Sequence, residues 1–461
     1  MPSATLLLPR HDPVAAESPI DDGVDALLPP RRLLPLSLQH VLVMYAGAVT
    51  VPLVVGRALN LAPAQLGLLI SADLVACGIA TLIQTIGMPR IGVRLPIMMG
   101  VTFASISPML ALIGTETAAG TPPAAVLTKI YGAVIVAGLF GFLVAPFVGR
   151  LSRLFPPAVT GTVILTIGLS LMGVGINWTA GGQPDDPSYG APVNLALAAA
   201  TLAVVLGLMR YGHGLVRSGA VLTGVVAGTL LASAMGMVDV APVTEAPWFA
   251  FVRPFQFGPP TIDPPASIAM CLVMMTVMIE SFGMFMAAGE MVGRPVDRRT
   301  MVRGLRGDAA GTLVGGVFNT FPYTSFAQNI GLLSITGVRS RYVCAGAGVI
   351  LLVLGLCPKL AALVAAVPLP VLGGAALVMF GMIAATGVRI LGSVELTFER
   401  LVTVAVSIAA GLIPVLSHKF FQAMPAALAP LLNSGIVLAS VSAVGLNAFF
   451  AGRRTAEENV L

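Results

Sequence analysis

Charged side chains are scarce in this sequence. Asp, Glu, Lys and Arg together make up only 10% of the 461 residues, whereas hydrophobic residues make up 57%. A soluble domain has about 25% charged residues, and the mean hydropathy of +0.95 leaves too little polar surface to cover an aqueous fold. The composition therefore excludes a soluble protein and predicts an all-α polytopic membrane protein.

Cysteine is also rare. The four cysteines lie inside apolar stretches without the spacing of metal ligands, so we interpret them as buried thiols. No Ser/His pair, His-based metal site or pair of catalytic aspartates falls at membrane depth. We therefore expect no catalytic residues, no bound metal and no cofactor, which argues against an intramembrane enzyme.

Long apolar segments recur from Leu38 onward, separated by short polar breaks. Most are long enough for a hydrocarbon core of about 30 Å, but the ninth and tenth are too short to cross alone. The fourteen predicted spans lie near 38–59, 66–86, 97–115, 125–146, 158–177, 193–210, 218–237, 266–291, 306–318, 322–337, 343–366, 370–391, 401–417 and 430–451. Residues 1–35 and 453–461 are expected to be tails, the first of them disordered.

The basic residues support this count of spans. With the N-terminus inside the cell, only Arg57, Lys129, Arg253, Lys359 and Lys419 fall outside, and the other twenty of the 25 face the cytoplasm. This bias predicts a protein of the cell (inner) membrane with both termini cytoplasmic. It also explains the net charge of +5 through contact with the lipid bilayer, so nucleic acid is not expected as a partner.

Two similar segments indicate an internal repeat. PAVTGTVILTIG begins at Pro157, and PVLGGAALVMFG begins at Pro370. Both keep glycine at the fifth and twelfth positions, and seven predicted spans separate them, so the second half would run inverted relative to the first. Inverted repeats are typical of alternating-access transporters, whose sites lie near the membrane midplane between broken helices.

Two segments at equivalent places in the halves are expected to break their helices. MMGVTFASISP runs from Met98 to Pro108, and NTFPYTSFAQN runs from Asn319 to Asn329. Proline removes a helical donor, and freed backbone groups are tolerated at membrane depth only where they line a cavity. The pair therefore predicts a ligand site. The alternative is that the Ser and Thr hydroxyls bond to carbonyls one turn back within intact helices.

Glu280 is the most informative acidic residue within the spans. It lies between MMTVMI and SFGMFM with no cation nearby in sequence. Burying a carboxylate at mid-membrane costs at least roughly 2.5–3.5 kcal/mol on insertion scales, so we expect Glu280 to be protonated part of the time or paired with a ligand N–H. Either state suits proton coupling. The alternative is an ion pair with a distant arginine.

The other intramembrane acids have two interpretations each. Glu290 is expected to be a helix-end charge at the cytoplasmic interface, with a functional role as the alternative. Asp308 either caps the start of a short helix or has a functional role. Asp73 either pairs with Arg57 or stabilises a broken helix.

Uncharged polar residues accompany these acids. Gln328 and Asn329 adjoin the second predicted break, where carboxamides suit the alternating N–H and C=O edge of a heteroaromatic ring. Phe103 and Phe326, one on each broken segment, are placed to cover the faces of such a ring. His40 opens the first predicted span, where its simplest interpretation is an interfacial histidine.

The segment from Gln328 to Gly337, QNIGLLSITG, resembles the signature of the nucleobase–ascorbate transporter family, an acidic or amide residue followed by N-x-G-x-x-x-x-T. QHVLVMYAGAV from Gln39 is similar to the family's first span, and the Glu280 segment is similar to its eighth. The resemblance extends from residue 36 to 451. MIESFGMFMAAGEMVGR and FPYTSFAQN are most similar to the bacterial uric acid and xanthine permeases.

The resemblance implies fourteen transmembrane segments in two inverted seven-helix repeats. Residues 36–155 (spans 1–4) and 266–367 (spans 8–11) would form a core domain, and residues 156–240 (spans 5–7) and 368–452 (spans 12–14) a gate domain. Short strands in spans 3 and 10 would meet at the substrate site. A homodimer is one assembly that we consider.

The resemblance also implies roles for individual residues. Glu280 would hydrogen-bond a purine, and Gln328 would read its other edge. The backbone at Phe103 and Ala327 would add contacts, and Thr102 would help to separate xanthine from urate. Three further residues would support the site geometry or the proton coupling: Asn329, Asp308 and His40.

One position departs from the family pattern. Many xanthine permeases have a second acid one turn after the eighth-span glutamate, where this chain has Met284. We therefore expect a proton symporter that imports uric acid, with xanthine as the next candidate. Because urate is an anion at neutral pH, uptake against an inside-negative potential requires a co-transported positive charge. The alternatives are a xanthine- or uracil-preferring permease of the family and a sulfate- or bicarbonate-type anion transporter of the same fold.

Overall fold

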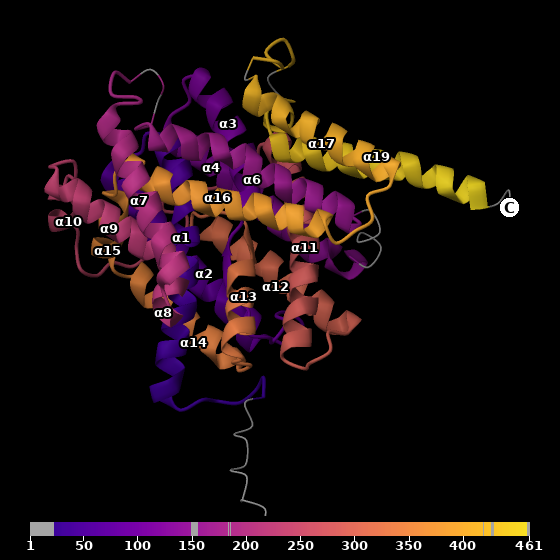
Figure 1. The fold of residues 1–461 in the computed structure, drawn as a ribbon, viewed down its shortest axis with the longest axis horizontal. Coiled ribbons are helices and arrows are strands. Elements are labelled where there is room, and N and C mark those ends of the chain that lie inside the picture. Colours follow the sequence, from indigo (N-terminus) through magenta and orange to yellow (C-terminus); the bar gives the residue numbers. More distant parts are fainter. Residues whose placement is uncertain are drawn as a thin grey trace, which may run out of the picture.

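Helices make up most of the protein, and two short strands interrupt them. A computed structural model describes residues 23–148, 155–182, 184, 186–417, 419–425 and 428–458 (Figure 1). In chain order the longer helices are α1 (Pro30–Ala58), α2 (Pro63–Ile86), α3 (Ile106–Ala118), α4 (Pro123–Val144), α6 (Pro157–Thr179), α7 (Pro192–Tyr211), α9 (Ala220–Ala234), α11 (Pro264–Met291), α12 (Arg298–Val317), α13 (Ala327–Thr336), α14 (Arg341–Gly355), α16 (Leu369–Leu391), α17 (Phe398–Leu416) and α19 (Gly435–Glu458). The short helices are η1 (Phe103–Ser105), η2 (Ala145–Phe147), α8 (Gly214–Ser218), α10 (Ala241–Glu245), α15 (Pro358–Ala365) and α18 (Ala429–Leu432).

Proline begins many of these helices. The first residues of α1, α2, α4, α6, α7 and α11 are all prolines. The fixed φ of proline suits the first helical position. Proline also lacks an N–H, which costs nothing there because an N–H at this position would have no acceptor within the helix. Much of the proline in this sequence therefore defines where membrane helices start.

Eight of the described helices are long and apolar enough to cross a membrane. The number becomes nine when α14 and α15, which meet at an angle of 81°, are counted as one broken span. Each of the predicted spans contains a helix near the expected place. The protein is therefore a multi-pass membrane protein, while the full count of fourteen crossings and the inverted repeat remain predictions.

Two helices begin earlier than the apolar segments indicated. α1 starts at Pro30, and α12 starts at Arg298 with the side chain of Asp297 as its N-cap. Polar and basic first turns precede the apolar part of both helices, and a search for apolar runs misses such turns. His40 and Asp308 therefore lie inside helices, so the capping interpretation of Asp308 is wrong, while the interfacial interpretation of His40 stays a prediction.

The two predicted helix breaks are where the strands form. β1 (Met99–Val101) and β2 (Tyr323–Ser325) pair in antiparallel orientation, with Gly100 opposite Thr324. β1 contacts α1 and α2, and β2 contacts α11 and α12. The backbone groups freed from the helices are thus satisfied between the strands, and the alternative of intact helices is wrong.

The two helices that carry the similar segments lie side by side (Figure 1). Pro157 starts α6, and Pro370 is the second residue of α16. A Cβ added to Gly168 would meet the backbone of α16, and a Cβ added to Gly387 would meet the backbone of α6. Glycine at these two positions therefore lets the helices approach closely, as small residues do at membrane helix interfaces.

The other helices form groups around this pair. α2 packs against α1, α12 and α14, and α4 packs against α11 and α12. α7 packs against α9 and α16, whereas α17 packs against α6 and α19. In Figure 1, α17 and α19 lie on one side of the protein, and α7, α9 and α10 lie on the opposite side.

Candidate functional site

A cavity of about 290 Å³ lies at the ends of the two strands. Its walls come from η1, β2 and α11 and from the start of α13, and also from α6 and α16. Five of the predicted substrate-binding residues line it: Thr102, Phe103, Glu280, Phe326 and Ala327. The fold therefore brings these residues together from three separate parts of the sequence, and their contact with a substrate remains a prediction.

Glu280 is the acidic side chain of this cavity. It lies on α11 and is partly exposed. Among the described residues no basic side chain forms an ion pair with it. Its carboxyl group is thus available to a ligand N–H or to a proton, the two states expected for an uncompensated acid at membrane depth.

Asp308 lies behind β2 and does not line the cavity. The side chain is fully buried, and its Oδ1 accepts hydrogen bonds from Gln84 Nε2 at 2.7 Å and from Ser325 Oγ at 3.3 Å. Its Oδ2 has no partner among the described residues. Because Ser325 itself lines the cavity, Asp308 is connected to the cavity wall through one intervening side chain, and its supporting role stays a prediction.

His40 and Asn329 form one buried hydrogen-bonded pair. The Nδ2 of Asn329 lies 3.0 Å from Nδ1 of His40 and 3.0 Å from its backbone oxygen. An amide nitrogen only donates, so Nδ1 is the acceptor and the ring proton belongs on Nε2. The pair ties α1 to the first turn of α13, which begins at Ala327 in the cavity wall.

Asp73 is a buried acid whose role the sequence left open. Its Oδ1 accepts hydrogen bonds from Thr320 Oγ1 at 2.6 Å and from Tyr323 OH at 2.8 Å. Arg57 instead donates to the backbone oxygen of Ala365 at 2.8 Å, so the predicted pairing of Asp73 with Arg57 is wrong. Asp73 therefore anchors the start of β2 to α2. In the sequence, Asp73 stands out because it is an acid without a nearby cation inside an apolar segment.

The wall that α6 and α16 contribute was not predicted. It consists of Ile164, Ile167, Met382, Ile383, Thr386 and Arg389. The hydroxyl of Thr386 bonds to the backbone oxygen of Met382 at 2.9 Å. Arg389 is exposed, and within the described part of the chain it has no ion pair or hydrogen bond. The similar segments at Pro157 and Pro370 marked both helices, but they did not indicate which helix face meets the strands.

Two predicted residues lie beside the cavity or away from it. Gln328 is the second residue of α13, next to Ala327, and its side chain lies outside the described part of the structure. Glu290 is the penultimate residue of α11 and is exposed. This position agrees with the interpretation of Glu290 as a helix-end charge.

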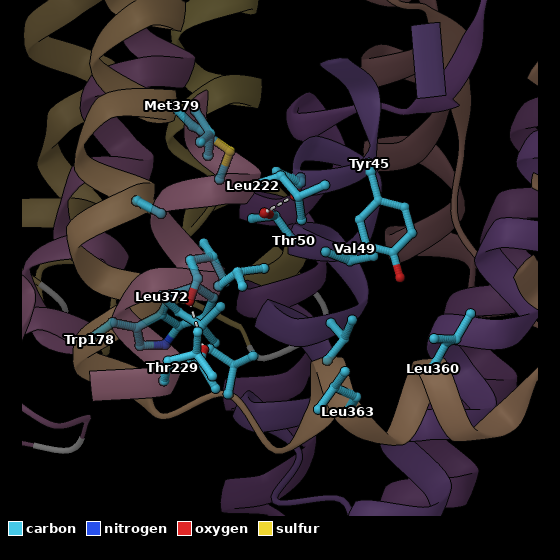
Figure 2. A pocket seen from close by; sticks show the side chains of 18 residues that line it. Tyr45, Val49, Thr50, Trp178, Leu222, Thr229, Leu360, Leu363, Leu372 and Met379 are labelled. Atoms are coloured by element: carbon cyan, nitrogen blue, oxygen red, sulfur yellow. Dashed lines mark hydrogen bonds between the residues drawn. The ribbon is translucent and has the colours of Figure 1, made fainter. Parts of the chain in front are cut away.

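A second cavity, of about 250 Å³, is almost wholly apolar (Figure 2). It lies between α1 and α15 on one side and α9 and α16 on the other, with Val49, Leu222 and Leu372 among its lining residues. The hydroxyls of Thr50 and Thr229 bond to carbonyls of their own helices, each at 2.7 Å. A ligand with several N–H and C=O groups would lose hydrogen bonds on entering this cavity, so the cavity at the strand ends is the candidate site for a polar ligand.

The architecture defines the class of protein. Helices able to cross a membrane surround a pair of short strands, and the interrupted helices end at a cavity that contains an acid without an ion-pair partner among the described residues. Discontinuous helices that form a polar site within the membrane are characteristic of secondary transporters. The protein is a multi-pass membrane transporter and not an enzyme.

The family follows from comparison of the whole sequence. The model of the permease family Xan_ur_permease matches residues 31–420. The chain therefore belongs to the nucleobase–ascorbate transporter family of permeases.

Several relatives match almost the whole chain. The uric acid transporter UacT of Escherichia coli (strain K12) is 51% identical over 94% of this chain and 88% of its own length. The uric acid permease PucJ of Bacillus subtilis (strain 168) is 44% identical over 92% of this chain and 93% of its own. The xanthine permease of the same Bacillus strain is 39% identical, over 90% and 93% respectively.

A solved structure has a similar fold. The transmembrane domain of a cyanobacterium bicarbonate transporter, BicA, matches with a TM-score of 0.60, over 90% of this chain and 98% of that one. The two sequences are 17% identical, so the similarity concerns the fold alone.

Proposed function

We propose that this protein imports a purine nucleobase by proton symport, with uric acid as the preferred substrate and xanthine as the next. The observation that carries the proposal is the cavity of about 290 Å³ in which Glu280 lies at the ends of two paired strands. The relatives named for uric acid and xanthine support the same class of substrate. The protein would lie in the inner membrane with both termini in the cytoplasm.

The size of the cavity suits a purine. An apolar cavity of about 150 Å³ holds a benzene molecule. A purine has two fused rings and less than twice the bulk of benzene, so a cavity of about 290 Å³ accommodates it with space for a few water molecules. Phe103 is a lining residue, and an aromatic ring suits the flat faces of the bicycle, whereas the ring of Phe326 packs against Gly47 and Gly100.

The hydrogen-bonding groups of the cavity suit the edges of a purine. Phe103 is the first residue of η1 and Ala327 is the first residue of α13. Backbone N–H groups in the first turn of a helix have no partner within that helix, so they are available to a purine carbonyl oxygen. The carboxyl group of Glu280 accepts a ring N–H, and Gln328 follows Ala327 to read a second edge.

Arg389 adds a positive charge that suits an anionic substrate. It lines the cavity from α16 and has no ionic partner among the described residues. Urate carries a negative charge at neutral pH, and a guanidinium group forms strong hydrogen bonds to delocalised anions. Uric acid therefore meets a cation on one wall and a protonatable acid on another.

The acid Glu280 in the cavity supports proton coupling. Moving one charge against the membrane potential costs about 2.3 kcal/mol per 100 mV, so entry of the urate anion alone is unfavourable in a cell with an inside-negative potential. Protonation of Glu280 from outside would compensate the charge of the substrate and remove the repulsion between two anions in one cavity. Release of substrate and proton inside would then reset the site.

The way the cavity is built supports alternating access. Thr102, Phe103, Glu280 and Phe326 belong to the core domain that the sequence predicts, whereas α6 and α16 belong to the predicted gate domain. Phe103 meets Phe380 of α16 edge-on, with ring centroids 6.0 Å apart. Sliding of the core past the gate would break this contact and change the side from which the cavity opens. This motion accords with fourteen spans in two inverted repeats.

Two features favour uric acid over the alternatives. Met284, one turn after Glu280 on α11, places a nonpolar side chain where a second acid would otherwise raise the local negative charge. Sulfate and bicarbonate have no ring N–H for the carboxyl group of Glu280 to accept, whereas uric acid has several, so the acid suits the purine better than an inorganic anion. Competition of labelled urate uptake by xanthine, uracil, ascorbate and sulfate tests the order of preference, and inhibition by sulfate alone would overturn the proposal.

Substitution of the acid tests the mechanism. The full-length protein is reconstituted in vesicles with an imposed pH gradient, and uptake of labelled urate is measured for Glu280→Gln and for Glu290→Gln. Glu290 is a matched control because it lies exposed at the end of the same helix. We expect Glu280→Gln to lose proton-driven accumulation and its pH dependence, and Glu290→Gln to keep both. Wild-type rates with unchanged pH dependence in Glu280→Gln would contradict the coupling role.

A further inference from the structure

A cavity of about 510 Å³ outside the substrate site is lined by five arginines. They come from the segment after α2 and from the first three turns of α12: Arg90, Arg298, Arg299, Arg303 and Arg306. The other lining residues are Pro89, Pro146 and Val302, so no acidic side chain of the described residues contributes to the wall. We call this cavity the arginine cavity.

Asp297 compensates the positive charge of the arginine cavity only in part, through its attraction to Arg299 and Arg303. Asp297 is the nearest acid in sequence, and its Oδ1 accepts a hydrogen bond from the backbone N–H of Thr300 at 2.8 Å as the cap of α12. Among the described residues, none of the three ion pairs involves an arginine of the cavity. Like charges collected in one hollow repel each other, so an anion bound there would stabilise the arrangement.

Two arginines of the cavity also have unused donors. The Nε atoms of Arg303 and Arg306 are buried and have no hydrogen-bond partner among the described residues. The guanidinium group of Arg306 lies over the ring of Phe142 on α4, with its carbon 5.1 Å from the ring centroid. This stacking fixes the direction of a charged group beside the cavity, as expected for a built anion site.

An exposed apolar stripe on α4 leads to the same cavity. Leu139, Leu143 and Phe147 are 53%, 63% and 58% exposed, and Pro146 beside Phe147 lines the cavity. Residues four apart lie on one face of a helix, so these side chains form a continuous surface along α4 and η2. In a multi-pass protein such a surface faces lipid, which places the arginine cavity where a lipid chain ends and its headgroup begins.

We propose that the arginine cavity binds an anionic phospholipid, with the phosphate among the arginines and an acyl chain along Leu139, Leu143 and Phe147. Arginine forms paired, charge-assisted hydrogen bonds to phosphate, and basic pockets between membrane helices on the cytoplasmic side suit anionic headgroups. A soluble phosphate would satisfy the arginines equally well but would make no use of the apolar stripe. The proposal does not depend on which substrate the protein transports.

The lipid would stabilise a helix that also supports the substrate site. α12 carries the arginines on its first turns and Asp308 further along the same helix. Arg303 additionally accepts a hydrogen bond at its backbone oxygen from the N–H of Gly92, at 2.8 Å. A bound phosphate would therefore hold the start of α12 against the segment after α2, and it would fix the position of the helix behind β2.

Binding of lipid to the full-length protein tests this proposal. The protein is purified in a neutral detergent, phosphatidylglycerol or phosphatidylcholine is added, and bound lipid is counted by native mass spectrometry. The test variant is Arg298→Gln/Arg299→Gln, because both side chains are exposed and form no hydrogen bond within the described part of the chain. The matched control is Arg31→Gln/Arg32→Gln, an exposed arginine pair at the start of α1 outside the cavity. Both variants lose the same charge.

We expect wild type and control to retain phosphatidylglycerol in preference to phosphatidylcholine. The test variant should bind phosphatidylglycerol roughly 30-fold more weakly, since each basic residue near an anionic lipid contributes a factor of about five. An equal Tm of variant and wild type in phosphatidylcholine shows that the variant is folded. Unchanged phosphatidylglycerol binding by the test variant, or equal weakening in the control, would overturn the proposal.

A second arm distinguishes a lipid from a soluble anion. The Tm of the wild type is measured with added phosphatidylglycerol, with glycerophosphate and with inorganic phosphate, since a ligand raises Tm by binding the folded state. A rise with phosphatidylglycerol that neither soluble phosphate reproduces supports the lipid. An equal rise with inorganic phosphate would show a soluble anion site and refute the lipid as the ligand.

Discussion

Removal of the positive charge of Arg389 is expected to weaken the recognition of anionic urate. A cavity of about 290 Å³ has a radius of about 4 Å when treated as a sphere, so a charge at its centre lies roughly 6 Å from a guanidinium group in its wall. Two unit charges at that separation interact by about 0.7 kcal/mol in water and about 2.8 kcal/mol at a dielectric constant of about 20. Arg389 is exposed, so the lower value applies.

This energy sets the size of the expected effect. Arg389→Gln should raise the KM for urate about 3-fold, and Arg389→Glu, which reverses the charge, should raise it about 10-fold. The KM for a purine that is neutral at the assay pH should stay within error of wild type, because no net charge is attracted. The urate effect should shrink at about 1 M salt, where the screening length falls to about 3 Å.

Initial uptake rates into vesicles measure these values over a range of urate concentrations. Arg389→Lys should restore most of the urate KM, and Arg210→Gln, a change at an exposed arginine near the end of α7, serves as the control. An equal rise in KM for urate and for the neutral purine would show that Arg389 acts through packing. A KM for urate that does not change in Arg389→Glu would refute the electrostatic reasoning.

Two further predictions concern stability, and both are checked by the Tm of the purified protein. Gly168→Ala should lower the Tm because the added Cβ meets the backbone of α16, which cannot yield, whereas Gly207→Ala on α7 should leave it unchanged or raise it, since nothing lies within 4 Å of its added Cβ. Asp73→Ala should lower the Tm more than Asp73→Asn, because it removes the carboxyl oxygen to which the buried hydroxyl of Thr320 donates at 2.6 Å, at about 1–3 kcal/mol, whereas the hydroxyl of Tyr323 keeps the backbone oxygen of residue 73 as an acceptor at 3.0 Å. A higher Tm for Gly168→Ala, or equal Tm values for the two Asp73 variants, would contradict these explanations.

Local chemistry predicted the two helix breaks and the acid in one wall of the cavity, whereas the pairing of two short strands was implied by the family resemblance. The prolines and small polar residues around Pro108 and Pro322 cannot continue a membrane helix without exposing backbone groups. An acid such as Glu280 is costly in an apolar segment unless it has a function. Both signals are visible without any knowledge of how the helices pack.

The opposite wall could not be predicted because it depends on which faces of α6 and α16 meet the strands. Arg389 looked like one of the many basic residues that set the topology, and its place in the cavity follows only from the close packing of the two helices. The capping interpretation of Asp308 failed, and the place of His40 inside α1 was missed, for a different reason. Both helices begin with polar or basic turns, so their apolar segments start several residues after the helices themselves.

The pairing of β1 with β2 has a consequence for how the protein is made. The N–H and C=O groups of Met99–Val101 find their partners in Tyr323–Ser325, which the ribosome adds about 220 residues later. At a synthesis rate of roughly 5–20 residues per second, this interval lasts on the order of 10–45 s. During that time the first interrupted helix lies in or near the membrane with unpaired backbone groups, which hydrocarbon does not tolerate. Insertion of the first half must therefore leave β1 in contact with water or with the insertion machinery until the second half arrives to complete it.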